Sequence, residues 1–259
     1  MKKMKVFEVF FVFCVGDTIA DAVVDHNRNL TAFPERCRKL NLTLNHQKVK
    51  LRLSEVPFIG HFLTANGIVT NPNKLRAIKD MPTPTDVTSL KRFLGMVKYL
   101  AKFLPHLSSV SERLRRLEVK DTEWCWLPVH DEAVQQIKSL VCDAPVLKFY
   151  DVAQPVTVES DASLSGLGAT PLQGGQPVVF ASRAFPPAES RYAQIEKELL
   201  SVVFACERFD TYLYERDIVH VKTDHQPLEA ICKTDLSSAP RRLRWMLLRL
   251  QRYNYKYSS

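Results

Sequence analysis

The stretch PVTVESDASLSGLGA, residues 155–169, decides the fold of the second half of this 259-residue chain. In its first part, Val156 and Val158 alternate with polar residues, the last of which is Asp161. Successive side chains of a β-strand point to opposite faces, so the valines share one face and the polar residues share the other. The stretch therefore predicts a strand that rests its valine face on a helix and ends its polar face on an aspartate.

The same pattern returns in IVHVKTDHQPLEAI, residues 218–231, where a valine face lies opposite a polar face that ends at Asp224. Between the two strands, AQIEKELLSVVFA (193–205) has the apolar spacing of an amphipathic helix. Glu198 borders the apolar stripe of this helix. If the helix packs beside both strand ends, the carboxylates of Asp161, Glu198 and Asp224 converge.

Three carboxylates that meet repel one another and therefore need cations. Hard oxygen ligands select Mg²⁺ or Mn²⁺. Two such ions about 4 Å apart can activate a water and stabilise the leaving oxygen of an in-line phosphoryl displacement. Taken singly, each acid is more simply a solubilising charge on a strand end or helix surface. The shared context predicts a metal site for phosphodiester hydrolysis, with the simpler interpretation still open.

The net charge of +8 is unevenly distributed along the chain. Residues 1–150 carry 23 Lys and Arg against 15 Asp and Glu, whereas residues 151–259 carry 13 of each. This excess suits contact with a phosphate backbone, although a solvated basic surface explains it equally well.

The last part of the chain is rich in arginine. A helix over 240–253 would turn its leucines toward the core and most of its arginines outward. Such a face is first a solvated helix surface and second a nucleic-acid contact. The candidate contact residues are Arg241, Arg242, Arg244 and Arg249.

The cysteine spacing and the N-terminal sequence indicate in which cellular compartment the chain is expected. The six cysteines include no C-x-x-C pair, which favours buried, reduced thiols in the cytoplasm or nucleus over disulfides or a zinc cluster. The N-terminal MKKMK and VFFVFCV loosely imitate a secretory signal, but Glu8 interrupts the apolar run. We expect a buried strand from Val9 to Val15 instead of a signal peptide, and no segment long enough to span a membrane.

The remaining pattern predicts an α+β first half and an α/β second half. Isolated tryptophans such as Trp124 and Trp126 more often anchor a core than stack on bases. The expected elements of the first half begin with a helix over 17–40 that is kinked or broken at Pro34, and a hairpin of 49–54 with 56–65 that is followed by a turn at Asn66-Gly67. Four more helices are then expected: one over 73–81, one that Asp86 caps, one over 107–117 and one over 129–141. Those of the second half are strands over 155–161, 167–173 and 176–183, a helix over 187–214, a strand over 217–224, a short helix from Pro227, the basic helix, and a strand from Asn254.

The chain resembles part of a gypsy-type, long-terminal-repeat retrotransposon polyprotein, in which a ribonuclease H follows a reverse transcriptase. Residues 45–150 resemble the thumb and connection of the polymerase, and residues 1–44 a remnant of its palm. Residues 151–259 resemble the ribonuclease H. The stretches that carry the resemblance are FIGHFLTANGI, LKRFLGMVKYLAKFLPHLS, Trp124-Cys125-Trp126, APVLKFYD, SDASLSGLGA, FASRAF, RYAQIEKELLSVVFA and TDHQPLEAI.

This resemblance implies a mixed five-stranded sheet with packed helices, and hydrolysis of the RNA strand of RNA–DNA hybrids with two Mg²⁺ ions. It implies that Asp161 bridges both ions, while Glu198 and Asp224 hold the ion on the leaving-group side. The partner would be an RNA–DNA hybrid or another nucleic acid. A catalytically inactive nucleic-acid-binding remnant, or a fragment that does not fold stably, are the alternatives.

Two departures from the family pattern are expected to matter. The polymerase motif Y-x-D-D is replaced by EVFFVFCVGDTIAD, in which Asp17 stands alone, so we expect no DNA synthesis. The family's fourth carboxylate lies on a helix beyond the strand that begins near Asn254, and the sequence ends at Ser259 before it. We expect its loss to weaken activation of the water more than binding of the hybrid.

Overall fold

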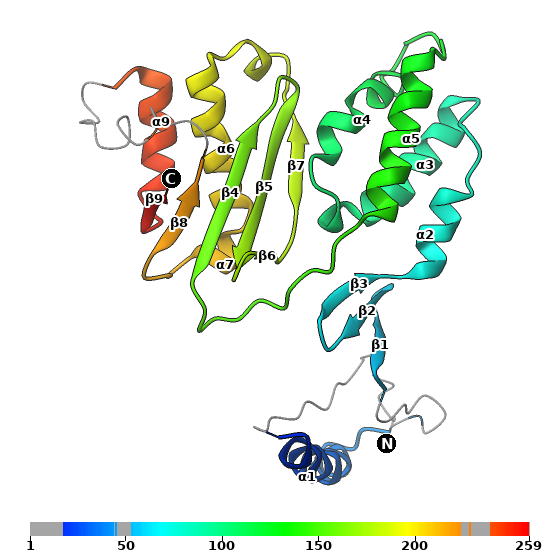
Figure 1. Cartoon of the computed structure of the whole chain (residues 1–259), viewed down its shortest axis with the longest axis vertical. Helices are drawn as coiled ribbons and strands as arrows, with labels where there is room; N and C mark the ends of the chain where they lie inside the picture. Colours follow the sequence, from blue (N-terminus) through cyan, green and yellow to red (C-terminus); the bar gives the residue numbers. More distant parts are fainter. Residues whose placement is uncertain (1–17, 44, 46–52, 224–227, 229–238, 259) are drawn as a thin grey trace. The chain divides into compact units, whose positions relative to one another are not determined.

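The structure is a computed structural model that describes residues 18–43, 45, 53–223, 228 and 239–258. Contacts divide the chain into two compact units, Met1–Leu53 and Ser54–Ser259, and each is described by itself. Figure 1 shows the elements of both units with their labels.

In the first unit, helix α1 spans Ile19–Lys39. The Thr18 side chain caps it by accepting a hydrogen bond from the Asp21 backbone N–H. The helix predicted over 17–40 is therefore confirmed, but it does not break at Pro34, which lies inside it. A proline removes only one backbone hydrogen bond from a helix, and the other turns of this 21-residue helix remain. The strand expected over 9–15 lies outside the described residues.

The second unit begins with a three-stranded antiparallel sheet, β1 (Glu55–Phe58), β2 (His61–Thr64) and β3 (Gly67–Thr70). The predicted turn at Asn66-Gly67 is confirmed, since Thr64 pairs with Gly67. The single strand predicted over 56–65 is wrong, because it folds back on itself at Ile59 and Gly60. Both residues have positive φ, 42° and 69°, which makes the tight turn. Of the partner strand expected over 49–54, residues 49–52 lie outside the described residues.

Four helices then pack around one buried cluster that includes Phe93, Phe103 and Leu114. Asp86 caps the second of them, as predicted, by accepting a hydrogen bond from the Ser89 backbone N–H. The two rings of Trp124 and Trp126 stack with centroids 5.4 Å apart and pack against this cluster. The helices are α2 (Pro72–Lys79), α3 (Val87–Tyr99), α4 (Leu107–Arg116) and α5 (Pro128–Cys142), with a short 3-10 helix, η2 (Ala101–Phe103), before α4.

The rest of the unit is a mixed sheet, as predicted. In the described part of the chain, the strand order is β6-β5-β4-β8-β9, and β7 also pairs with β5. The pairs of β4 with β8 and of β8 with β9 are parallel, and the others are antiparallel. The strands are β4 (Val156–Ala162), β5 (Gly166–Gln173), β6 (Gln176–Pro177), β7 (Ala181–Ala184), β8 (Val219–Lys222) and β9 (Tyr255–Ser258).

The sheet differs from the expected five strands because the strand predicted over 176–183 is split. Between β6 and β7, the Phe180 backbone N–H donates to the Lys102 carbonyl oxygen of the helical region instead of to a neighbouring strand. The helix predicted over 187–214 is also divided, because Phe209 leaves helical geometry at φ −108° and ψ 21°. Its parts are η3 (Glu189–Arg191), α6 (Gln194–Arg208) and α7 (Asp210–Leu213).

Helix α6 covers the valine face of the sheet, and helix α9 (Arg241–Leu250) packs beside α6. Val156, Val158 and Leu199 belong to one buried cluster, which α9 completes with Leu243 and Leu247. The alternation of valines with polar residues along the strands therefore predicted on which face of the sheet the helices pack. The predicted division into residues 1–44, 45–150 and 151–259 stays a prediction, although residues 54–259 hold two separate buried clusters.

The four cysteines in the described part of the chain are free. Burial raises the pKa of the Cys206 thiol to about 12. The expectation of buried thiols is confirmed for Cys37 and Cys206 and wrong for Cys125 and Cys142, while Cys14 and Cys232 lie outside the described residues. Among the helices that the structure describes, none combines the length and apolar character that a membrane span needs.

The Gln173 side chain ties the segment before β4 to the sheet. It is 1% exposed, accepts from the Asp151 N–H and donates to the carbonyl oxygens of Asp151 and Gln154. Gln173→Ala takes these partners from part-buried backbone groups, so we expect the free energy of unfolding to fall by about 1–2 kcal/mol. Urea denaturation of Gln173→Ala beside Gln176→Ala, an exposed glutamine of the same hairpin, measures it. Equal unfolding midpoints for the two variants would contradict this role.

Candidate active site

Asp161 lies near the end of β4, on the open face of the sheet. Along the strand, Val156, Val158 and Ser160 are buried whereas Asp161 is exposed. This alternation is the one predicted from the sequence. The Asp161 carboxylate is thus available to a ligand, while its strand is held by the core beneath it.

Glu198 lies on the second turn of α6 and is only 8% exposed. The Gln194 side chain, one turn earlier, donates a hydrogen bond of 2.5 Å to its Oε1. A buried carboxylate is costly unless such donors or a cation compensate it. Gln194 therefore orients the Glu198 carboxylate from within the same helix.

Two serines join the strand of Asp161 to the helix of Glu198. The Ser201 hydroxyl lies 3.1 Å from the Ser160 hydroxyl and also donates to the Glu198 carbonyl oxygen at 2.7 Å. Ser160 directly precedes Asp161, and Ser201 follows Glu198 by one turn. Small polar residues at this contact let α6 approach β4 closely. The structure thus brings Asp161 and Glu198 to the same end of β4.

Asp224, the third predicted ligand, lies outside the described residues. The structure describes β8 up to Lys222, which pairs with Glu159 of β4 in parallel register. Among the described residues, no group of three or more His, Cys, Asp or Glu side chains is placed to hold a metal ion. Of the predicted trio, the structure therefore places two members.

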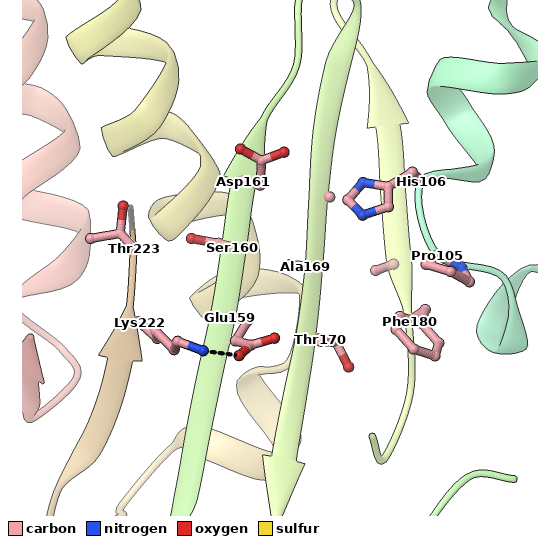
Figure 2. A pocket seen from close by; sticks show the side chains of 12 residues that line it. Pro105, His106, Glu159, Ser160, Asp161, Ala169, Thr170, Phe180, Lys222 and Thr223 are labelled. Atoms are coloured by element: carbon pink, nitrogen blue, oxygen red, sulfur yellow. Dashed lines mark hydrogen bonds and ion pairs between the residues drawn. The ribbon is translucent and has the colours of Figure 1, made fainter. Parts of the chain in front are cut away.

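A pocket of about 370 Å³ opens on the face that carries Asp161. Its floor comes from β4 and β5, and the loop before α4 contributes Pro105 and His106 to its wall (Figure 2). Within it, Lys222 Nζ lies 2.9 Å from Glu159 Oε1. Both partners are about half exposed, so this ion pair contributes at most about 1 kcal/mol to stability. Its main effect is to neutralise one of the two acids beside the pocket.

The arginines of α9 lie away from this pocket, on the helix that packs on α6. Arg242 Nη1 lies 2.7 Å from both oxygens of Glu196, and Arg249 Nε lies 2.7 Å from Glu207 Oε1. Arg244 donates to the Ala239 carbonyl oxygen. Arg242 and Arg249 are thus ion-paired within the fold, and a nucleic-acid contact through Arg241, Arg242, Arg244 and Arg249 stays a prediction.

Sequence reasoning missed two parts of the site. The Ser160–Ser201 contact joins residues 41 positions apart and has only small, polar side chains as its sequence signal. His106 belongs to the helical region, yet it lines the pocket beside Asp161. The sequence signal for this contact is Gly168, where β5 has no side chain to exclude the ring.

Comparisons with known proteins point to one group. Residues 126–220 match the family described as the RNase H-like domain found in reverse transcriptase. The chain is 35% identical over 218 residues to the retrovirus-related Pol polyprotein from transposon opus of Drosophila melanogaster, covering 78% of this chain and 22% of the relative. It is 31% identical over 236 residues to the Pol polyprotein from transposon 297 of the same organism, covering 91% of this chain and 22% of the relative.

The chain thus spans about a fifth of the length of these relatives. Among solved structures, the foamy viral protease-reverse transcriptase in complex with RNA/DNA hybrid superposes with a TM-score of 0.75 at 22% identity. That match covers 95% of this chain and 34% of the viral chain. At this identity the match shows a shared fold, a mixed α/β arrangement with helices packed on a mixed sheet.

Proposed function

We propose that this chain hydrolyses the RNA strand of RNA–DNA hybrids. Residues 126–220 match the RNase H-like domain found in reverse transcriptase, and most of the chain is similar to Pol polyproteins of transposons. The proposed metal ligands lie in residues 151–259. DNA synthesis is not part of the proposal, because Asp17 stands alone where a polymerase has adjacent aspartates.

The observation that carries the proposal is the placement of Asp161. This carboxylate is exposed on the floor of a pocket, and the serine beside it binds the helix of Glu198. A solubilising charge needs no such neighbour, whereas two carboxylates at one strand end can hold a hard cation together. The interpretation of Asp161 as a solubilising surface charge therefore explains less of its surroundings than that of a metal ligand does.

Asp161, Glu198 and Asp224 are the residues that we propose to hold divalent cations. The described donors are carboxylate oxygens, which fit Mg²⁺ and Mn²⁺. Asp224 follows Lys222 by two residues, as Asp161 follows Glu159, and Lys222 pairs with Glu159. The register of the described part of β8 is thus the one that an Asp161–Asp224 neighbourhood requires.

The residues of this chain bind, orient and hold charge at the site. Gln194 fixes the direction of the Glu198 carboxylate, and the Ser160–Ser201 contact fixes α6 against β4. When bound, two Mg²⁺ ions supply activation of a water and stabilisation of the leaving oxygen. The open face beside Asp161 leaves room for a phosphodiester strand to approach.

Removal of divalent cations is expected to stop cleavage completely. A hybrid with labelled RNA, incubated with the purified chain in EDTA, should stay intact, and added Mg²⁺ or Mn²⁺ should restore cutting. Ca²⁺ takes more ligands in a looser geometry, so it should restore less activity than Mg²⁺. Cleavage that persists in EDTA would exclude the two-metal mechanism. Hybrid binding without cleavage in any of these ions would favour the inactive nucleic-acid-binding alternative.

A further inference from the structure

His106 is an exposed residue with an unusual backbone, in the loop between η2 and α4. Its φ is +51° and its ψ is 21°, the left-handed region in which His, Asn and Asp are enriched among non-glycine residues. The backbone turns here so that the imidazole lies over β5. A Cβ built on Gly168 would lie 3.0 Å from His106 Nδ1 and 3.3 Å from its Cε1. The ring thus occupies the space that a side chain at residue 168 would fill.

Hydrogen bonds to the sheet hold this loop on both sides of His106. Before it, the Lys102 carbonyl oxygen accepts from the Phe180 N–H at 2.8 Å. After it, the Ser108 N–H donates to the Ser182 hydroxyl at 3.0 Å, and the hydroxyls of Ser109 and Ser163 lie 3.1 Å apart. A histidine held in the left-handed region between such anchors is a built feature of the pocket rather than a loop side chain resting on a surface.

Gly168 is the residue that pairs with Asp161 across β4 and β5. Paired residues of antiparallel strands face the same side of the sheet, with Cα atoms about 5 Å apart. The His106 ring therefore lies on the Asp161 face, over the residue that pairs with Asp161. Figure 2 shows the ring beside β5 and Asp161 on the adjacent strand β4. Within the described part of the chain, neither ring nitrogen of His106 has a hydrogen-bond partner.

These observations leave an imidazole N–H without a protein acceptor, beside the place where a cation-bound phosphate would lie. Phosphate oxygens are the commonest acceptors that proteins contact on nucleic acids. We propose that His106 donates a hydrogen bond to a backbone phosphate of the nucleic-acid strand bound beside Asp161. This inference rests on the proposed function for the identity of the ligand. It makes the helical region before the sheet part of the substrate-binding surface.

The experiment compares the affinities of the wild-type chain and of His106→Gly for a labelled RNA–DNA hybrid, by fluorescence anisotropy in Ca²⁺. Glycine accepts positive φ without strain, so the variant removes the ring and keeps the turn. We expect its Kd to rise by about tenfold, the loss typical of a hydrogen bond to a charged group. Single methylphosphonates, placed one at a time along each strand, then locate the contact. At one position the modification should weaken the wild-type chain and leave His106→Gly unchanged.

Gly168→Ala tests the same contact while His106 itself is not substituted. The added methyl group lies too close to the ring, so the ring must move, and we expect hybrid binding to weaken by no more than in His106→Gly. The double variant should bind no more weakly than His106→Gly alone. Gly95→Ala is the matched control, because a Cβ at Gly95 meets no atom within 4 Å. Its affinity should equal that of the wild-type chain.

The proposal is overturned if His106→Gly binds the hybrid as tightly as the wild-type chain. It is also overturned if every methylphosphonate weakens both proteins equally, since the ring would then act only by packing on Gly168. Absence of hybrid binding by the wild-type chain would overturn it together with the proposed function. If the wild-type chain binds the hybrid but does not cut it, the proposed cleavage alone is contradicted. The comparison of hybrid affinities would then still decide the role of His106.

Discussion

Asp161→Asn is expected to lower the rate of hybrid cleavage in Mg²⁺ by more than about 100-fold, because even the outer partners of metal ligands are worth 10–100-fold. Asparagine keeps the shape of the side chain but removes its charge and one of its oxygen donors. Asp161 is exposed, so the substitution leaves the packing beneath β4 unchanged. Binding of the hybrid should be retained, since it depends mainly on contacts with the phosphate backbone. Single-turnover cleavage of labelled RNA measures the effect.

Asp217→Asn is the matched control for this substitution. Asp217 is exposed and precedes β8. Strands β4 and β8 are parallel and their first paired residues are Val156 and Val219. Asp217 therefore lies at the end of this strand pair that is opposite to Asp161. This variant should cut at the wild-type rate. Equal rates for Asp161→Asn and the wild-type chain would show that the observed cleavage comes from a contaminating nuclease or from another site.

Leu199→Ala is expected to destabilise the chain by about 3–5 kcal/mol, the cost of a buried leucine truncation that leaves a cavity. Leu199 is fully buried where α6 rests on the valine face of the sheet. Leu164→Ala makes the same chemical change at a side chain that is 89% exposed, and it should change stability by no more than about 0.5 kcal/mol. Urea denaturation followed by circular dichroism measures both.

The comparison also tests whether the chain folds stably as it stands. A cooperative transition in which only Leu199→Ala shifts the midpoint shows that the sheet and α6 form a fixed core. A broad transition that neither substitution shifts would contradict this core and favour the alternative of a chain that does not fold stably.

The sequence predicted elements well where one periodic pattern decided them. The valines of β4 and β8 alternate with polar residues, so the buried face of the sheet and the position of Asp161 follow from a period of two. The helix of Glu198 follows from its apolar stripe in the same way. These patterns are local, and β4, β8 and the central part of the predicted helix, α6, follow them.

The misses share a different origin, since contacts with distant residues decide them. The run VPFIGHFLTA (56–65) is apolar almost throughout, so its turn at Ile59 and Gly60 has little local signal. The Phe180 N–H leaves the ladder because the Lys102 carbonyl oxygen, 78 positions earlier, accepts it. The contact of His106 with Gly168 likewise depends on how α4 meets the sheet, and no periodic pattern encodes it. The positions of Asp161 and Glu198 were therefore predictable from the patterns of one strand and one helix, whereas the position of His106 was not.

The most direct test of the central claim is the fate of each strand of a hybrid in Mg²⁺. RNA and DNA strands carry different end labels, and both are followed over time with the wild-type chain and with Asp161→Asn from identical preparations. We predict internal cuts in the RNA strand alone, made by the wild-type chain alone. An intact RNA strand with the wild-type chain, or cuts that Asp161→Asn makes equally well, would contradict the assignment of this pocket as a ribonuclease H site.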